Sequence, residues 1–317
     1  MFFKRKDFIS LKEISAEEIL YILNTAETMK IVLSQANKKA PHLRGKSVIL
    51  MFYEKSTRAR MSYELAAQYL SANIVDLTLA YALGEAGNLI DMGNLIDQMG
   101  ADFIVIRHPM SGSARLLAEY ARAGVINAGD GLNENPSQSM LDLMTIKTQK
   151  GGFEGLKVTI VGDIAHSRVT HSNIWALMKL GTEVTLTGPT TLIPDEWAEF
   201  GPRITYNAAD AVRGADVIMV VKAREMENLG QYLPSMNEYR NLFKIDERLM
   251  KLAKPDAIVM HPGPISRGIE LSSQVIDSPQ CLSNDQIANG VAVRMALLYL
   301  LSLSDANPRE RREAARV

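Results

Sequence analysis

Short apolar runs alternate with segments of helical periodicity along most of the chain. The first helix is predicted by a capping box at Ser15 and Glu18, which apolar residues follow at helical spacing. Each later apolar run is short enough for a strand, and most are followed by a helical segment. The predicted strands are 47–53, 74–77, 103–106, 125–127, 157–161, 183–187, 217–221 and 257–260. The later helices are predicted to begin at 56–57 and to span 89–99, 114–121, 138–149, 168–180, 207–213 and about 284–303.

This alternation predicts an α/β fold with two domains. Strands that alternate with helices are typical of a parallel sheet covered by helices on both faces. Three glycines within residues 150–155 interrupt the pattern, and a second alternating series begins after them. We therefore predict two doubly wound parallel-sheet domains, residues 1–150 and residues 151–283. The length of 317 residues agrees with this division, at about 100–200 residues per domain.

Composition and charge narrow the range of functions. The chain has 35 Lys and Arg against 36 Asp and Glu and no Lys/Arg-rich block, which disfavours binding to nucleic acid or to an anionic membrane. Arg294 interrupts the most apolar segment, and no run approaches the roughly 18 residues of a membrane span. The N-terminal residues lack the apolar core of a signal peptide, and Cys281 has no partner for an intrachain disulfide. These features predict a cytoplasmic protein.

Polar residues suited to an anion follow the first and third predicted strands. In an open parallel sheet, ligands bind beyond the carboxyl ends of the strands. The turn from Ser56 and Thr57 to Arg58 and Arg60 offers hydroxyls, helix N-terminal amides and two guanidinium groups, a combination suited to phosphate. Arg107 would place a further guanidinium near the same rim. Ser56 as a plain helix cap and Arg107 as a surface charge are the alternatives.

Further candidates follow the later strands. Asn135 and Gln138 carry amides that can donate to a carbonyl oxygen, although they can also simply mark the start of a helix. Arg168 lies near another helix start, where it is available to a substrate carboxylate. Pro262 and Gly263 belong to a rigid turn that could present backbone carbonyls to a ligand.

The sequence offers little for metal, cofactor or covalent chemistry. The five histidines show no ligand spacing such as HExxH, so we expect no metal site. No Gly-x-Gly-x-x-Gly follows a predicted strand, which disfavours a dinucleotide cofactor. There is no Gly-x-Ser-x-Gly elbow, and the single cysteine lacks flanking catalytic signals.

Taken in order, the motifs resemble those of the aspartate/ornithine transcarbamylase family, and of its aspartate branch in particular. The resemblance extends over nearly the whole chain. The motifs are FYEKSTRAR at 52–60, GAD at 100–102, IRHP at 106–109, NAGDG at 127–131, NPSQ at 135–138, GDIAHSRV at 162–169, HPGP at 261–264 and RGIE at 267–270. The resemblance implies a carbamoyl-phosphate domain, then an amino-acid domain, and a C-terminal helix that returns to the first domain. It also implies a homotrimer with active sites between subunits, which can belong to a larger assembly.

The resemblance implies a role for each candidate residue. The phosphate of carbamoyl phosphate would be held by Ser56, Thr57, Arg58 and Arg107. Gln138 would bind the carbamoyl amide, and Arg168 the carboxylate of the amino-acid acceptor. In this family the acceptor amine attacks the carbamoyl carbon, polar groups stabilise the oxyanion, and phosphate leaves with a proton. No cofactor is required, and the ancestral acceptor is aspartate, in pyrimidine biosynthesis.

The carbamoyl-phosphate side departs from the family pattern at three places. Ala59 replaces the second threonine of the family's Ser-Thr-Arg-Thr-Arg turn. Asn135 stands where the family has a histidine that polarises the carbamoyl oxygen, and asparagine cannot become charged. The family also supplies a lysine from a loop of the neighbouring subunit, but residues 81–85 contain none, and none lies between Lys55 and Lys147. Lys55 itself is a possible substitute for this charge.

The acceptor side is altered as well. The family's Arg-x-Gln becomes Lys222-Ala-Arg224, and lysine cannot reproduce bidentate carboxylate binding. Three hypotheses follow: a carbamoyltransferase with an altered acceptor or strongly reduced activity, an inactive paralogue that serves as a structural or regulatory subunit, and an ordinary aspartate enzyme with tolerated substitutions. The missing loop lysine counts against the third hypothesis. The changes at Ala59 and Asn135 favour the second, whereas changes confined to the acceptor side would favour the first.

Overall fold

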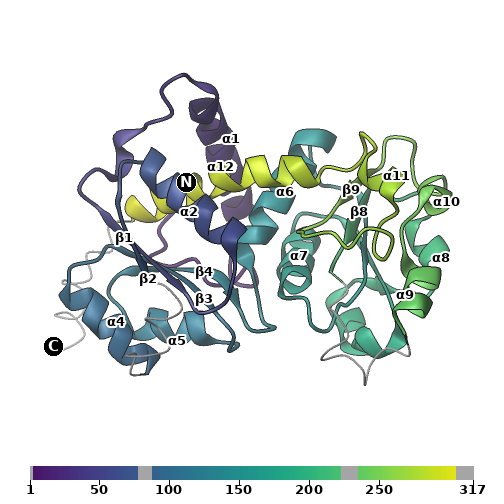
Figure 1. The fold of residues 1–317 in the computed structure, drawn as a ribbon, viewed down its shortest axis with the longest axis horizontal. Helices are drawn as coiled ribbons and strands as arrows, with labels where there is room; N and C mark the ends of the chain where they lie inside the picture. The colour runs from purple at the N-terminus through teal and green to yellow at the C-terminus, as the bar shows by residue number, and fades with distance from the viewer. Residues whose placement is uncertain (1–2, 78–87, 223–234, 305–317) are drawn as a thin grey trace. The chain divides into compact units, whose positions relative to one another are not determined.

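Two compact units, each built on one parallel sheet, make up the computed structural model of the chain (Figure 1). The structure describes residues 3–77, 88–222 and 235–304. Unit 1 comprises Met1–Leu141 and Asn289–Val317, and unit 2 comprises Asp142–Ala288. The predicted α/β class with two parallel sheets is confirmed.

The sheet of unit 1 has four strands in the order β2-β1-β3-β4, and every neighbouring pair is parallel. Its strands are β1 (Ser47–Phe52), β2 (Asn73–Leu77), β3 (Phe103–His108) and β4 (Gly124–Asp130). The helices that begin in this unit are α1 (Ala16–Ser34), α2 (Thr57–Tyr69), α4 (Leu89–Gln98), α5 (Ser113–Tyr120) and α6 (Pro136–Lys150), and a short 3-10 turn η1 spans Pro41–Leu43. Strands β1, β3 and β4 are almost entirely buried, and the burial of β1 and of most of β3 explains why these two appear in the sequence as continuous apolar runs.

The last helix, α12 (Ser283–Ser302), contributes its residues from Asn289 onward to unit 1. Lys30 of α1 donates to Asn289 over 2.8 Å. The charge of Arg294 is accommodated inside this apolar helix because Nη1 donates to Ser62 over 2.8 Å and the guanidinium lies 4.8 Å from the ring centre of Tyr63. Within the described residues, no helix combines the length and the apolar character needed to cross a membrane.

The sheet of unit 2 has five parallel strands in the order β7-β6-β5-β8-β9. They are β5 (Lys157–Val161), β6 (Glu183–Thr187), β7 (Arg203–Ile204), β8 (Val217–Val220) and β9 (Ile258–Met260). The helical elements are α7 (Arg168–Lys179), η2 (Thr190–Leu192), η3 (Asp195–Phe200), α8 (Ala208–Val212), α9 (Met236–Phe243), α10 (Glu247–Met250) and α11 (Ser273–Ile276). Strand β7, both 3-10 segments and α9 to α11 were not predicted from the sequence.

Each sheet has one point at which the direction of strand addition reverses. In unit 1 the chain moves outward from β1 to β2 and then returns to β3 on the other side of β1. In unit 2 it moves from β5 to β6 and β7 and then returns to β8 beside β5. Ligands of open α/β sheets bind beyond the carboxyl ends of the strands at such points. The loops that follow β1, β3, β5 and β8 are therefore the first places to look for a site.

Candidate active site

The turn after β1 forms the first candidate rim. Ser56 is the N-cap residue of α2, but its side chain makes no capping hydrogen bond. The hydroxyl of Ser56 is therefore not consumed by the helix cap, which was the alternative interpretation of this residue. Thr57 and Arg58 are exposed in the first turn of the same helix, beside its N-terminal amides. Hydroxyl, amide and guanidinium donors together suit a phosphate group.

The second guanidinium expected in this turn is directed elsewhere. Arg60 forms an ion pair with Asp76 of the edge strand β2. Its position in sequence, two residues after Arg58, suggested that both arginines serve one anion. The helical geometry explains the difference, because residues two apart on a helix do not share a face.

Arg107 lies at the carboxyl end of β3, the strand next to β1. Its Nε lies 3.0 Å from Oε2 of Glu54, and Nη1 donates to the carbonyl of Ala128 over 3.3 Å. The side chain of Arg107 is 17% exposed, so these partners fix a largely buried guanidinium at the rim. The register between β3 and β4 shifts between Ile106 and His108, and such irregularities commonly redirect a side chain next to a site.

His108 follows Arg107 and is held in its neutral form. Burial lowers the pKa of its imidazole, and the nearby carboxylates of Glu54 and Asp130 oppose this effect less strongly. Nδ1 accepts the N–H of Met110 over 3.0 Å, and the ring packs edge-on against Tyr53. His108 is thus a neutral neighbour of the first candidate rim and adds no positive charge to it.

Asn135 and Gln138 lie at the start of α6. Asn135 is buried, with 7% of its surface exposed, and its Oδ1 accepts the hydroxyl of Ser137 and the backbone N–H of Gln138, both over 3.3 Å. The side-chain oxygen of Asn135 therefore caps α6, as the alternative interpretation of the NPSQ motif proposed. Capping by the oxygen does not use the amide nitrogen, which is the donor that the family resemblance assigns to this position.

A buried carboxylate holds the loop that carries Asn135. The carboxylate of Asp130, 1% exposed, accepts hydrogen bonds from four groups. The donors are Asn127 Nδ2, the N–H of Gly112, Asn133 Nδ2 and the N–H of Glu134. The next carboxylate, Glu134, is also buried, and it accepts the hydroxyl of Ser10 and the N–H of Leu11. The loop between β4 and α6 is therefore fixed to β4 and to the N-terminal segment.

We expect Asp130→Ala to destabilise the protein strongly. The substitution removes the acceptor of four donors, two of which belong to the buried residues Asn127 and Glu134, and this should lower the free energy of unfolding by about 3 kcal/mol or more. Urea denaturation measures this change, and Asp210→Ala, an exposed residue in α8, is the matched control with an expected loss below about 1 kcal/mol. Equal midpoints for Asp130→Ala and the wild type would contradict this account of the loop.

The second candidate rim lies in unit 2, after β5. Gly162 has φ +134°, and a Cβ there would lie 2.9 Å from the carbonyl oxygen of Val221, so only glycine fits. The next residue, Asp163, is 1% exposed and lies 2.9 Å from Nδ1 of His166, whose backbone N–H it also accepts. Arg168, 9% exposed, is the first residue of α7. The turn after β5 thus places the mostly buried guanidinium of Arg168 at this rim.

The remaining candidates of unit 2 surround the same edge of the sheet. Lys222 is half-buried and lies two residues after the end of β8, whereas Arg224 lies outside the described residues. Pro262 and Gly263 are half-buried in the loop after β9. Tyr239 of α9 is buried, and its burial, with the nearby carboxylates of Glu270 and Asp163, raises the pKa of its phenol, so the hydroxyl stays protonated.

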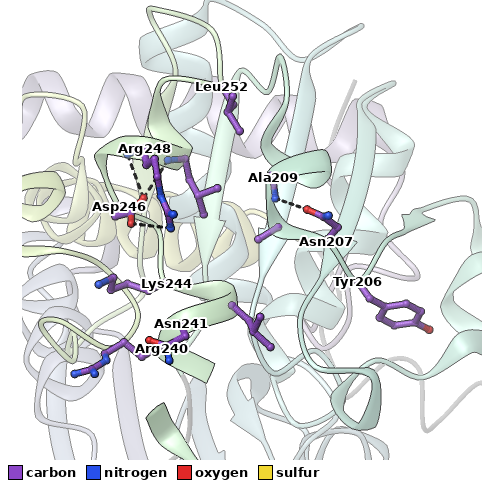
Figure 2. A pocket seen from close by; sticks show the side chains of 12 residues that line it. Tyr206, Asn207, Ala209, Arg240, Asn241, Lys244, Asp246, Arg248 and Leu252 are labelled. Carbon is purple, nitrogen blue, oxygen red and sulfur yellow. Dashed lines mark hydrogen bonds and ion pairs between the residues drawn. The ribbon is translucent and has the colours of Figure 1, made fainter. Parts of the chain in front are cut away.

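A cavity of about 500 Å³ in unit 2 lies apart from all of these candidates (Figure 2). It is lined by the segment from β7 into α8 and by residues in and around α9 and α10, and none of its lining residues is a predicted site residue. Figure 2 shows Arg240 and Lys244 extending away from Tyr206, while Arg248 reaches Asp246. These cations do not converge on one ligand group. In the described part of the chain, no group of three His, Cys, Asp or Glu side chains is arranged to hold a metal ion.

Comparison with known proteins connects this geometry to a class of enzymes. The family models described as the carbamoyl-P binding domain and the Asp/Orn binding domain of aspartate/ornithine carbamoyltransferase match residues 6–148 and 154–301. The aspartate carbamoyltransferase catalytic subunit of Acetivibrio thermocellus is 53% identical over 307 residues, which cover 96% of this chain and 98% of the relative.

Solved structures agree with these matches. Ornithine carbamoyltransferase from Pyrococcus furiosus has a TM-score of 0.84 and 32% identity, with 95% of this chain and 98% of that chain covered. Aspartate transcarbamoylase from Trypanosoma cruzi, in complex with carbamoyl aspartate and phosphate, has a TM-score of 0.84 and 26% identity, with 94% and 96% covered.

The two parallel-sheet units are thus those of a two-domain transcarbamylase, as predicted. The chain belongs to the aspartate/ornithine carbamoyltransferase family. The resemblance stated from the motifs is therefore confirmed.

Sequence reasoning missed the groups that hold the candidate residues in place. The pairs Glu54–Arg107, Asp163–His166 and His261–Glu270 were not predicted, although both members of each pair lie in the motifs quoted above. A carboxylate or histidine within a few positions of a predicted ligand residue is the signal that could have identified them, as His261 directly before Pro262 illustrates.

Proposed function

We propose that this chain transfers the carbamoyl group of carbamoyl phosphate to the amino group of an amino acid, with aspartate as the first acceptor to test. The observation that carries the proposal is the rim after β1, where the Ser56 hydroxyl is not used by the helix cap and Arg58 is exposed beside helix N-terminal amides. Arg107, fixed by Glu54, stands at the end of the neighbouring strand. A dianionic phosphate group matches this set of donors.

The chemistry assigned to these groups is positioning and electrostatic stabilisation. The amine forms a C–N bond to the carbamoyl carbon, the C–O bond to phosphate breaks, and the amine proton leaves with the phosphate. Ser56, Thr57, Arg58 and Arg107 would hold the phosphate and take up its charge as the bond breaks. Gln138 and the amide of Asn135 would bind the carbamoyl group. Arg168 and Lys222 would bind the acceptor's carboxylates, together with Arg224, and the carbonyls of Pro262 and Gly263 its amine.

The proposal assigns a different substrate to each of the two domains. Residues 1–150 with about 284–303 would form the carbamoyl-phosphate domain, and residues 151–283 the acceptor domain. The descriptions of the two matched family models support this assignment. The proposed setting is the cytoplasm and pyrimidine biosynthesis, without a cofactor. The name of the Acetivibrio thermocellus relative supports aspartate as the acceptor.

We further propose that turnover with aspartate is slow. Ala59 removes a hydroxyl from the phosphate turn, and the region between Lys55 and Lys147 supplies no lysine to the site. Asn135 can donate a neutral hydrogen bond but cannot carry the charge of an imidazolium. Loss of one oxyanion donor alone costs about 10²–10³ in rate. Lys55, exposed one residue before Ser56, is the available substitute for the missing charge.

The experiment is carbamoyl-phosphate-dependent release of phosphate, measured with a panel of amines. The panel contains aspartate, other amino acids with one or two carboxylates, ornithine and simple diamines. We expect release above the hydrolysis background with at least one amino acid. No release with any amine would contradict the proposal and favour the inactive paralogue, a structural or regulatory subunit, which the substitutions at Ala59 and Asn135 support.

We also propose a homotrimer, because the family resemblance assigns part of each site to a neighbouring subunit. Light scattering across micromolar concentrations measures the mass of the particle in solution. A mass of three chains is expected, and a stable monomer at all concentrations would contradict the proposal.

A further inference from the structure

A chain of buried polar side chains lies behind the loop that follows β9. His261, which directly follows that strand, has a fully buried imidazole. Its Nδ1 accepts the N–H of Gly263 over 2.8 Å, and its Nε2 lies 3.0 Å from Oε2 of Glu270. Because Nδ1 is an acceptor, the hydrogen-bond partners assign the proton to Nε2, which donates to Glu270. One imidazole therefore connects the backbone of the loop to a carboxylate in the interior.

Glu270 forms hydrogen bonds to the loop after β9 from its buried side. Its carboxylate is fully buried, and Oε2 also accepts the N–H of Ser266 over 2.8 Å. A buried carboxylate and imidazole cost more to desolvate than apolar side chains of the same size, and such pairs are weak contributors to stability. Their partners here are loop amides, so the pair defines the path of residues 261–270 rather than filling the core.

The same network extends to the helix that carries Arg168. The backbone N–H of His261 donates to Oε1 of Gln286 over 3.0 Å, and Nε2 of Gln286 donates to Asp142 over 2.7 Å. The other oxygen of Asp142 accepts Nδ2 of Asn173, in α7, over 3.0 Å. All of these side chains are at most 3% exposed. The loop after β9 and helix α7 are therefore tied to one another through hydrogen bonds that water does not reach.

We infer that His261 and Glu270 are positioning residues for the acceptor: they hold the backbone of Pro262 and Gly263 in the orientation that binds the amino-acid substrate, without touching it. The inference rests on the proposed function. Backbone carbonyls bind a substrate amine well only when their direction is fixed beforehand, and a displacement of about 1 Å can cost about 10²-fold in rate. The network fixes the backbone of Gly263 through the hydrogen bond from its N–H to Nδ1 of His261.

Two substitutions of His261 test its hydrogen bonds to Gly263 and to Glu270 separately. In His261→Asn the side-chain oxygen replaces Nδ1 and can still accept the N–H of Gly263, but the side chain does not reach Glu270. In His261→Gln the amide nitrogen replaces Nε2 and can still donate to Glu270, but no acceptor remains for Gly263. Thr159→Val is the matched control, because it removes one buried hydrogen bond of unit 2, to the carbonyl of Ala211, far from the loop in sequence.

The experiment measures kcat and KM for both substrates below the melting temperature of every variant. We expect His261→Gln to lower kcat/KM for the amino acid by about 10²-fold, with most of the effect in the amino-acid KM. His261→Asn should lose much less, and KM for carbamoyl phosphate should stay unchanged in both variants. Amide exchange followed by NMR gives a second readout, in which the Gly263 N–H loses protection only in His261→Gln.

The outcomes distinguish the inference from the proposed function. Activity in the wild type with equal kcat/KM in His261→Gln, His261→Asn and Thr159→Val would overturn the positioning role. If the wild type shows no turnover, the same comparison is made on the calorimetric Kd for aspartate in the presence of phosphate. A wild type that neither turns over nor binds any amino acid would overturn the proposed function, and the inference with it.

Discussion

Replacing Arg58 by alanine is expected to weaken binding of phosphate and of carbamoyl phosphate by about 10²–10³-fold, because truncating one partner of a charge-assisted contact costs about 2–5 kcal/mol. Calorimetry with inorganic phosphate measures the effect directly, and with carbamoyl phosphate it confirms that the natural ligand behaves alike. Arg44→Ala is the matched control, since Arg44 is an exposed arginine of the same unit outside the rim.

Arg58 is chosen over Arg60 because the structure separates their roles. Arg60 is paired with Asp76, whereas Arg58 is exposed in the first turn of α2. Equal phosphate affinity in Arg58→Ala and in the wild type would show that the rim after β1 does not bind the phosphate. Absence of phosphate binding by the wild type itself at millimolar concentration would contradict the anion site altogether.

Restoring the family pattern at four positions is expected to raise turnover with aspartate by about 10³-fold, equivalent to about 4 kcal/mol of transition-state stabilisation. The variant combines Leu83→Lys, Asn135→His, Lys222→Arg and Arg224→Gln. Leu83 and Arg224 lie outside the described residues, so their part of the prediction rests on the family resemblance. At position 135 a neutral imidazole can accept the N–H of Gln138 at Nδ1 and donate from Nε2, so it keeps the cap of α6 while it adds a ring donor.

The control for this variant isolates the charge of the new lysine. The same combination with Leu83→Met in place of Leu83→Lys keeps a long side chain without the positive charge, and it should recover much less activity. Initial rates of carbamoyl-aspartate formation at saturating substrates provide the measurement. If the four-position variant is no faster than the wild type, the substitutions are not what limits the rate.

Most of the fold could be predicted from the sequence, because buried strands and helix caps leave patterns within a few neighbouring residues. Strands buried on both faces appear as uninterrupted apolar runs, and the Ser15–Glu18 capping box forms as predicted, with Oγ of Ser15 accepting the N–H of Glu18 over 3.2 Å. Strand β7 was missed because two residues, Arg203 and Ile204, carry no readable alternation. Helix α9 did carry a signal, since Ser235 caps it and accepts the N–H of Glu238, as in a capping motif.

The candidate site could be predicted only in part, because the residues that hold its side chains in place are distant from them in the sequence. The motifs after the strands identified the ligand-type residues, but Asp142 and Gln286 are 144 positions apart and no pattern in the sequence relates them. The pairing of Arg60 with Asp76 was likewise hidden, because Arg60 lies on α2 and Asp76 on β2, and their approach depends on how this helix packs against the sheet. Strand β4 continues to Asp130, beyond the predicted 125–127, because its polar residues are satisfied by one another inside the unit.

The measurement that tests the central claim most directly is the rate of carbamoyl-aspartate formation from ¹³C-labelled carbamoyl phosphate, followed by NMR. The Acetivibrio thermocellus subunit, 53% identical to this chain, is assayed in parallel and serves as the reference provided that its sequence carries the full set of family motifs. We predict product formation by this chain at a rate at least about 10³-fold below such a reference, consistent with the loss of about 4 kcal/mol of transition-state stabilisation. Turnover at about 10 s⁻¹ or more, which is an ordinary rate for an enzyme, would contradict the account. It would show that Lys55 or another group has replaced the missing charge.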